Sequence, residues 1–371
     1  MRGWFDISIS YLQNCDIWVS LNISALQYAF SFFDKQVNSG FRRETIITEL
    51  KVIMRHSALI LILVLFIGCS GIPCYPPEYY APGKSAPYVA EEVNVSTQVG
   101  HVLAGTLTIP KDVNQPLPGV VLITGSKPMN RDFTPAFVPK YYRPFRKIAD
   151  ALSRRGIAVL RMDDRGCGCS GGGPLESATT AERADDIRAG ISYLKDREEI
   201  NDSRIGLIGW SEGGIIAPMI AVTDRSIIAI VLIAGPATKG DVIMDFQAGT
   251  GWRDYVESYS EWYQFFVEYD PLPTAEMVRC PVLILHGDQD NHVPVEHAHI
   301  IAEAIRKGGN QDVTVHIFPD YDHRFIHDGI GRSKEEVKNK KKDEKSLNEI
   351  ELFPPDVLGV ISDWIVSKLT L

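Results

Sequence analysis

The sequence predicts an α/β fold in which a mostly parallel sheet is covered by helices on both faces. Short continuous apolar runs, such as residues 118–124 (PGVVLIT), are typical of buried parallel strands. They alternate with amphipathic stretches, such as 142–155 and 179–197, which are typical of surface helices. The chain of 371 residues is 45% hydrophobic and 23% charged, which excludes a mostly disordered chain and a multi-pass membrane protein.

The remaining elements follow in order along the chain. Residues 93–98 and 102–110 alternate apolar and polar side chains and are expected to pair as a hairpin around Gly100. Thr180, with Glu182 beside it, is the expected cap of the helix over 179–197. Further strands are expected at 157–162, 204–209, 227–234, 281–286 and 313–317, and further helices at 211–222, 295–307 and 355–368.

Two stretches interrupt this alternation. Residues 240–273 are rich in aromatic side chains and lie between two predicted strands, where an insertion would cap the carboxyl ends of the sheet. This cap indicates a substrate with an apolar acyl group. Residues 333–345 (SKEEVKNKKKDEK) carry dense mixed charge, which is typical of a solvated excursion. The net charge of −9 argues against a nucleic-acid partner, which would require a basic stripe.

An apolar run at residues 58–67 (ALILILVLFI) has the length of a signal-peptide core. As a helix it would extend about 15 Å, roughly half of a bilayer core. Met54 and Arg55 precede it, and a glycine followed by Cys69 closes it. The pattern resembles a bacterial lipoprotein signal peptide, which implies that Cys69 is lipidated and becomes the mature N-terminus. Phe66 stands where leucine is usual in that pattern.

This resemblance divides the chain into four parts. Residues 1–53 are expected to be a mis-assigned N-terminal extension, and 54–69 a lipoprotein-like signal peptide. Residues 70–91 are expected to be a proline-rich tether, because the four prolines within residues 74–87 favour an extended chain over a helix or a central strand; an arm lying on the domain surface is the alternative. Residues 92–371 form the folded domain, with the cap insertion at about 240–273. The expected location is the cell envelope, lipid-anchored and facing the periplasm or exterior; a single N-terminal membrane anchor is the alternative.

The pattern G-x-S-x-G occurs at residues 209–213 (GWSEG), directly after an apolar strand and at the start of a helix. A nucleophile elbow needs this context, because its glycines permit the sharp turn that exposes the serine, here Ser211. The N-terminus of the following helix directs backbone N–H groups at an oxyanion. The pattern therefore predicts Ser211 as a nucleophile.

An acid and a histidine follow Ser211 in the chain, each beyond a predicted strand. Asp290 lies in the loop after one strand, and His323 lies after the next strand. Serine, aspartate and histidine in this order are typical of the α/β-hydrolase triad. Asp288 is an alternative acid, for which a turn role is the competing interpretation. His327 is an alternative histidine, but it lies further from the strand end.

A family resemblance rests on stretches spread across the predicted sheet: GTLTIP, ITGSKPMNRD, RRGIAVLRMDDRGCGCSGG, RIGLIGWSEGG, YDPLPTAEMVRCPVLILHGDQD and FPDYDHRF. They resemble the bacterial α/β-hydrolase esterases of the dienelactone-hydrolase and serine-aminopeptidase neighbourhood. The resemblance implies an α/β-hydrolase fold with Ser211 as nucleophile, His323 as general base and acid, and Asp290 orienting the imidazole. It also implies an oxyanion hole formed by the backbone N–H groups of Glu212 and Ser126.

No cofactor and no metal is expected. His292, His297 and His299 cluster around Glu296, which is the composition of a zinc site. On a helix, however, His292 and Glu296 would share a face from which His297 and His299 point away, and this favours an exposed helix.

The cysteines give no disulfide framework, because six in a chain of this length are too few for a disulfide-stapled scaffold. Cys167 and Cys169 are spaced too closely for a common zinc site. An exported location permits oxidation of these cysteines, but the sequence does not indicate a particular disulfide bond.

The function expected from these observations is cleavage of small carboxylic esters through an acyl-enzyme intermediate. A serine peptidase or amidase of the same fold is the first alternative, since a fold does not select a substrate. A non-catalytic binding protein on a hydrolase scaffold is the second alternative. The expected partners are an ester substrate and, through the lipid on Cys69, a membrane.

Overall fold

The computed structural model describes residues 72–111, 116–134, 142–247, 261–326 and 353–370. These residues belong to the unit Cys69–Leu371. Among them, no helix combines the length and the apolarity that are needed to cross a bilayer.

Several sequence predictions lie outside the described residues and stay predictions. They concern the extension 1–53, the signal peptide 54–69 with Cys69, the alternative histidine His327, the charged stretch 333–345 and the middle of the cap, 248–260.

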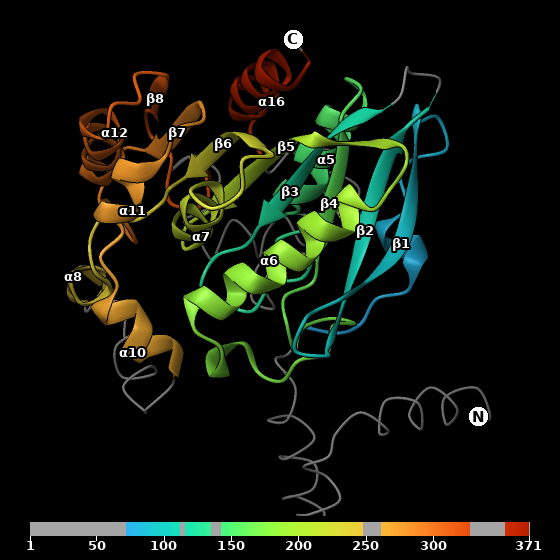
Figure 1. Cartoon of the computed structure of the whole chain (residues 1–371), viewed down its shortest axis with the longest axis horizontal. Helices are drawn as coiled ribbons and strands as arrows, with labels where there is room; N and C mark the ends of the chain where they lie inside the picture. The colour runs from blue at the N-terminus through green and yellow to red at the C-terminus, as the bar shows by residue number, and fades with distance from the viewer. Residues whose placement is uncertain (1–71, 112–115, 135–141, 248–260, 327–352, 371) are drawn as a thin grey trace, which may run out of the picture. The chain divides into compact units, whose positions relative to one another are not determined.

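The described part of the chain forms an eight-stranded sheet in the order β1-β2-β4-β3-β5-β6-β7-β8 (Figure 1). Only the pairs β1–β2 and β2–β4 of this sheet are antiparallel. The carboxyl ends of β3 and of β5 to β8 therefore meet at one edge. The strands are β1 Tyr88–Ser96, β2 Val102–Pro110, β3 Leu117–Ile123, β4 Ala158–Met162, β5 Ile200–Trp210, β6 Ile227–Ile233, β7 Val282–Gly287 and β8 Val313–Phe318.

Helices cover both faces of this sheet, as the sequence predicts. On β3, Val121 and Ile123 belong to one apolar core, whereas Val120 and Leu122 belong to a second core on the opposite face. The first core includes side chains of α6 (Thr180–Lys195), α7 (Gly213–Ala221) and α12 (Glu296–Lys307). The second includes side chains of α5 (Pro144–Ser153) and α16 (Pro355–Leu369). Figure 1 shows α6 crossing one face of the sheet. The predicted α/β fold class is confirmed.

Shorter helices lie outside these layers. They are α4 (Pro77–Tyr80), the 3-10 helix η1 (Leu175–Ser177), α8 (Gly240–Gln247), α10 (Glu261–Glu268) and α11 (Leu272–Met277). Of these, α8 and α10 belong to the predicted cap insertion.

Two sequence predictions on element ends are wrong in detail. The cap of α6 is Thr179, whose hydroxyl accepts from Glu182 N while the Glu182 carboxylate accepts from Thr179 N, a reciprocal capping box. Thr180 is the first helical residue instead. The first strand begins at Tyr88 rather than at residue 93, because it pairs with β2 over its whole length, from Tyr88 opposite Pro110.

Residues 72–87 are not an extended tether, so this prediction is wrong for the described residues. Pro77 opens helix α4, where its missing N–H costs no hydrogen bond. Tyr80 is buried at 1% exposure, and the Arg131 guanidinium lies 4.2 Å from its ring centroid. A disulfide joins Cys74 to Cys169 in the loop after β4. The segment is therefore an arm that lies on the domain surface.

Candidate active site

The turn that carries Ser211 has the backbone of a nucleophile elbow. Ser211 lies between β5 and α7 with a φ of +56°, a left-handed conformation that is uncommon for a residue with a Cβ. The flanking glycines are required here. A Cβ on Gly209 would lie 2.0 Å from Gly213 O, and a Cβ on Gly213 would lie 2.5 Å from Ile123 O. The tight packing of these glycines holds the turn against the end of β3.

The predicted acid and histidine contact each other. His323 Nδ1 lies 2.7 Å from Asp290 Oδ2. The other carboxylate oxygen of Asp290 accepts hydrogen bonds from the backbone N–H groups of His292 and Val293, both at 2.8 Å. Burial acts to raise the pKa of Asp290, but the nearby charge of His323 and the hydrogen bonds from His286 and His323 outweigh it and hold the pKa below its ordinary range. Asp290 is therefore ionised beside the imidazole.

A second histidine fixes the same carboxylate. His286 Nε2 lies 3.1 Å from Asp290 Oδ2 and 2.9 Å from Val293 O. Both neighbours are acceptors, so His286 carries its proton on Nε2. Sequence reasoning missed this residue, although its position at the end of the strand before Asp290 was a usable signal.

The loop carrying His323 is hydrogen-bonded to the elbow and packs against it. Trp210 Nε1, from the residue before Ser211, donates to His323 O at 3.1 Å. Phe325, buried and with a φ of +54°, meets the Trp210 ring edge-on with 5.6 Å between centroids. Ser211, Asp290 and His323 thus follow β5, β7 and β8 at the same edge of the sheet.

The alternative acid has a different role. Asp288 is exposed, and its carboxylate accepts from Asp320 N at 2.7 Å, which ties the loop after β7 to the loop after β8. Within the part of the chain that the structure describes, only Asp290 of the two contacts His323.

The loop after β3 lies against Ser211, where the oxyanion hole is expected. A Cβ added to Gly125 would lie 3.1 Å from Ser211 Cβ, so the backbone before Ser126 packs directly on the elbow. Glu212 forms the N-cap of α7. In the described residues, the N–H groups of Ser126 and Glu212 donate to no protein acceptor. They remain available to an oxygen bound beside Ser211.

The Glu212 side chain links the elbow to the cap insertion. Its carboxylate is fully buried and accepts from Thr180 Oγ1 at 2.6 Å and from Arg183 Nη1 at 2.6 Å. Both oxygens also lie 3.0 Å from Nε1 of Trp262 on α10. Sequence reasoning considered only the backbone of Glu212. The available signal was an acidic residue within an apolar elbow, since a buried carboxylate needs partners.

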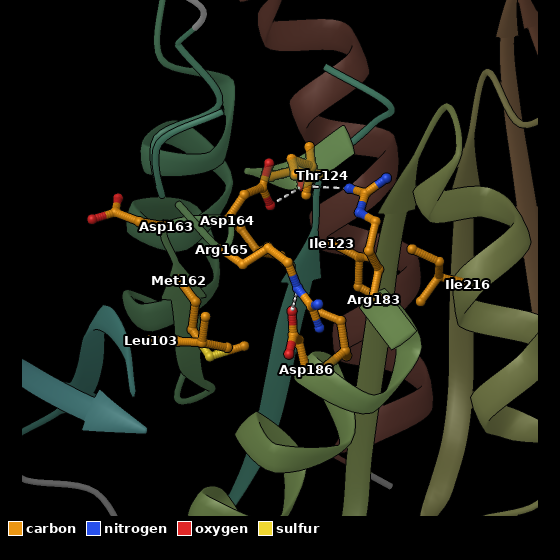
Figure 2. Close-up of a pocket in the computed structure, with 13 residues that line it drawn as sticks. Leu103, Ile123, Thr124, Met162, Asp163, Asp164, Arg165, Arg183, Asp186 and Ile216 are labelled. Carbon is orange, nitrogen blue, oxygen red and sulfur yellow. Dashed lines mark hydrogen bonds and ion pairs between the residues drawn. The ribbon is translucent and has the colours of Figure 1, made fainter. Parts of the chain in front are cut away.

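A small cavity of about 20 Å³ lies behind the loop after β3 (Figure 2). This volume admits about one water molecule, so the cavity is not a substrate pocket. Asp164 on its wall accepts from Thr124 Oγ1 and from Met129 N, which lie on either side of Ser126. Burial raises the pKa of Asp164 to about 7, although the charge of Arg183 and these hydrogen bonds oppose the rise.

An apolar cluster joins the cap to the triad region. It contains side chains of α7, α8, α10 and the loop after Asp290, namely Ile215, Ile243, Met244, Trp262, Phe266 and Val293. The described part of the cap is therefore packed against α7 and the loop after Asp290 through apolar side chains.

The three histidines of the candidate zinc cluster have different surroundings. His292 stacks on the His323 ring with 4.9 Å between centroids, and His297 Nδ1 accepts from Ala237 N at 2.9 Å. His299 is exposed. No group of three potential ligands suited to a metal ion occurs among the described residues. Of the cysteines in the glycine-rich loop, Cys169 pairs with Cys74, and Cys167 is a buried thiol.

Comparison with known proteins identifies the family. The model of the prolyl oligopeptidase family matches residues 144–345. The peptidase YuxL of Bacillus subtilis is 26% identical over 265 residues, which are 66% of this chain and 37% of that protein. Human dipeptidyl peptidase 8 is 26% identical over 274 residues, which are 67% of this chain and 28% of that protein. The chain thus spans about a third of the length of these relatives.

Solved structures share the fold. The esterase Pf2001 of Pyrococcus furiosus aligns with a TM-score of 0.54 and 20% identity, over 80% of this chain and 98% of its own. Est1E of Butyrivibrio proteoclasticus, with ferulic acid bound, has a TM-score of 0.54 and 17% identity, over 75% and 100%. A puromycin-hydrolysing peptidase of Mycobacterium tuberculosis has a TM-score of 0.55 and 16% identity, over 78% and 40%.

These comparisons confirm the predicted α/β-hydrolase fold and refine the family. The sequence stretches indicated the dienelactone-hydrolase and serine-aminopeptidase neighbourhood, whereas the matching model covers more than half of the chain and belongs to another family of the same fold. The chain belongs to the prolyl oligopeptidase family.

Proposed function

We propose that the chain cleaves small carboxylic esters through an acyl-enzyme, with Ser211 as nucleophile, His323 as general base and acid, and Asp290 as the group that orients the imidazole. The contact between His323 Nδ1 and Asp290 Oδ2, beside the left-handed turn at Ser211, carries this proposal. The ionised carboxylate holds the proton on Nδ1, which leaves Nε2 to accept the Ser211 proton.

The reaction then has two halves. Ser211 Oγ attacks the ester carbonyl carbon while His323 Nε2 takes the hydroxyl proton, and the carbonyl oxygen becomes an oxyanion that accepts from the N–H groups of Ser126 and Glu212. The imidazolium returns the proton to the departing alcohol oxygen, which leaves an acyl group on Ser211. Water attacks this acyl group with His323 again as base, and the carboxylic acid departs with Ser211 restored.

The proposal of an apolar acyl group is supported by the apolar character of the cap, which packs beside the elbow. Ile215 on α7 and Val293 after Asp290 belong to the same buried cluster as Trp262 and Phe266 of the cap. An apolar cap beside the nucleophile favours an apolar acyl group, whose burial contributes about 0.8 kcal/mol per methylene.

Peptide or amide cleavage is the second candidate function. The family match and the peptidases among the relatives support it. The fold and the triad serve both reactions, so the two candidates are distinguished only by comparing substrates with an alcohol leaving group and substrates with an amine leaving group.

We also propose export to the cell envelope with a lipid on Cys69, where the signal-peptide pattern of residues 54–69 ends. The disulfide between Cys74 and Cys169 supports this location, because disulfides persist in oxidising compartments. Intact mass of the native protein tests the proposal. A mature species that starts at a lipidated Cys69 is expected, and a species that retains residues before Cys69 contradicts it.

A substrate panel on the full chain tests the ester proposal. Turnover of p-nitrophenyl esters of increasing acyl length is compared with turnover of aminoacyl p-nitroanilides, and the Ser211→Ala variant is the control. We expect turnover of esters that depends on Ser211, with kcat/KM rising over the first added methylenes. A clear preference for the anilides supports the peptidase candidate instead. Equal turnover by Ser211→Ala contradicts the assigned nucleophile, and no turnover at all favours a binding role.

A further inference from the structure

We infer that Arg183 of α6 is a positioning residue that holds both backbone donors of the oxyanion hole in place. The inference rests on the proposed function, in which the N–H groups of Ser126 and Glu212 receive the oxyanion. Arg183 contacts neither the substrate nor Ser211 in this account. It acts through hydrogen bonds to both arms of the hole.

The first arm is the loop after β3. Arg183 Nη2 donates to Gly125 O at 2.7 Å. The carbonyl of Gly125 and the N–H of Ser126 belong to the same peptide unit, which is planar, and in the trans form the two groups point in opposite directions. Holding the carbonyl on the guanidinium therefore directs the Ser126 N–H away from Arg183. The hydrogen bond also polarises this peptide and strengthens its N–H as a donor.

The second arm is the residue after Ser211. Arg183 Nη1 donates to Glu212 Oε2 at 2.6 Å, and Thr180 Oγ1, one turn earlier on α6, donates to Glu212 Oε1 at 2.6 Å. Both carboxylate oxygens are thus held from α6, which restrains the side chain and with it the backbone of Glu212. The two nitrogens of one planar guanidinium set the spacing between the two arms.

The surroundings of Arg183 leave it little freedom. Its side chain is 4% exposed, so water does not compete for these bonds. Arg183 Nη2 also donates to Thr124 Oγ1 at 3.3 Å, and Thr124 in turn donates to Asp164 (Figure 2). Asp164 accepts from Met129 N as well, so the loop containing Ser126 is held on both sides.

A lysine does not replace this arrangement. A single ammonium nitrogen is a point donor on a flexible stem, whereas the guanidinium presents two NH₂ groups in a fixed fork. Arg183→Lys therefore keeps the charge that Glu212 requires but loses the simultaneous hold on Gly125 and Glu212. This makes Arg183→Lys a test of positioning in a protein that keeps its buried ion pair.

A buried arginine from the same region supplies the matched control. Arg165 donates to Asp186 Oδ2 at 2.7 Å and to Glu182 O at 3.2 Å, and it contacts neither arm of the hole. Arg165→Met removes a buried, ion-paired guanidinium packed on α6 and leaves Gly125 and Glu212 untouched. This control separates the effect of losing a buried arginine from the effect of losing the hydrogen bonds that join Gly125 to Glu212 through Arg183.

The experiment measures kcat and KM for a p-nitrophenyl ester in wild type, Arg183→Met, Arg183→Lys and Arg165→Met, together with Tm. Loss of one oxyanion donor costs about 10²- to 10³-fold in kcat. We expect kcat to fall about 100-fold in Arg183→Met and at least about 10-fold in Arg183→Lys, with KM within about threefold. Arg165→Met is expected to lower Tm but to keep kcat within about threefold of wild type.

A second readout separates transition-state binding from stability. Affinity for a trifluoromethyl ketone, which forms a tetrahedral adduct with the serine, is expected to fall by the same factor as kcat/KM in both Arg183 variants. Wild-type kcat in Arg183→Lys, or equal kcat losses in Arg183→Met and Arg165→Met, overturns the inference. If Arg183→Met does not fold, Arg183→Lys decides alone. If wild type hydrolyses no ester and its Ser211 does not react with a fluorophosphonate, the proposed hydrolase function is refuted, and the result does not bear on the positioning role of Arg183.

Discussion

His323 and Asp290 meet at 2.7 Å between Nδ1 and Oδ2, across the loops that follow two neighbouring strands. The carboxylate is also held by His286 and by two backbone N–H groups. Because these partners keep the pKa of Asp290 below its ordinary range despite its burial, the carboxylate stays charged throughout the neutral range. An imidazole oriented by a fixed charge is the central element of the proposed reaction.

Asp290→Asn tests the acid against its alternative, Asp288. An amide holds the imidazole in the wrong tautomer, so we expect kcat for a p-nitrophenyl ester to fall about 10⁴-fold with little change in KM. Asp288→Asn is the matched control, because Asp288 is exposed and accepts from Asp320 N instead. Its kcat is expected within about threefold of wild type. The reverse pattern, with Asp288→Asn the inactive variant, would assign the acid to Asp288.

Trp262→Phe tests the link between the cap and the elbow. The variant keeps an aromatic ring beside Phe266, which stacks on Trp262 with 4.9 Å between centroids, but it removes the donor to Glu212. We expect the free energy of unfolding, measured with urea, to fall by about 1–3 kcal/mol. Trp364→Phe on α16, a partly buried residue packed against the second core of the sheet, controls for the change of ring size. Equal losses in the two variants would show that the hydrogen bond to Glu212 contributes nothing.

The disulfide between Cys74 and Cys169 joins residues 95 positions apart, so its removal enlarges the unfolded ensemble. Cys74→Ser, Cys169→Ser and the double variant are each expected to lower the free energy of unfolding by about 2–5 kcal/mol. The three losses should be nearly equal, because either single change already opens the bond. Dithiothreitol should lower the Tm of wild type and leave the double variant unchanged. Additive losses, or an equal response of wild type and double variant to the reductant, contradict the bond.

His292 predicts a pH dependence of stability. Burial, followed by the charge of His323, lowers the pKa of His292 to about 4 in the folded protein, against about 6.5 when unfolded. The unfolded chain therefore binds a proton first, so the stabilisation is complete above pH 6.5 and is lost as the pH falls towards 4. This loss is expected to be on the order of 2 kcal/mol.

His292→Phe keeps a ring against His323 but cannot titrate. Urea unfolding at pH 6.5 and at pH 4.5 should show a smaller loss of stability in His292→Phe than in wild type. His299→Gln, an exposed histidine on α12, should retain the wild-type loss. If His292→Phe loses as much stability as wild type on acidification, the titration of His292 makes no contribution.

The central sheet was predictable because its strands are continuous apolar runs. Residues 281–286 and 227–234 were expected as strands and are observed as Val282–Gly287 and Ile227–Ile233. The turn at Ser211 was predictable from the spacing of its glycines, and the structure gives the reason for that spacing: Gly209 and Gly213 have no room for a Cβ. Local sequence determines both features.

The arm over residues 72–87 was not predictable from its prolines. Composition indicated an extended chain, whereas its position depends on Tyr80 reaching Arg131 and on Cys74 reaching Cys169. These partners are distant in sequence, and local patterns do not contain them.

The buried polar network was missed for the same reason. Glu212 is paired with Arg183, 29 positions away, and with Trp262, 50 positions away. An acidic residue within an elbow does not specify which helix brings its partner. Pairing of this kind depends on packing and is visible only once the helices are placed on the sheet.

The most direct test is modification of Ser211 by a fluorophosphonate probe, located by mass spectrometry of the labelled protein. Wild type is expected to react once, at Ser211, and to lose its ester turnover in step with labelling. Asp290→Asn should react much more slowly, because the imidazole no longer activates the hydroxyl. Labelling of Ser211→Ala as fast as wild type, or ester turnover that persists after Ser211 is labelled, contradicts the role of Ser211 as the nucleophile.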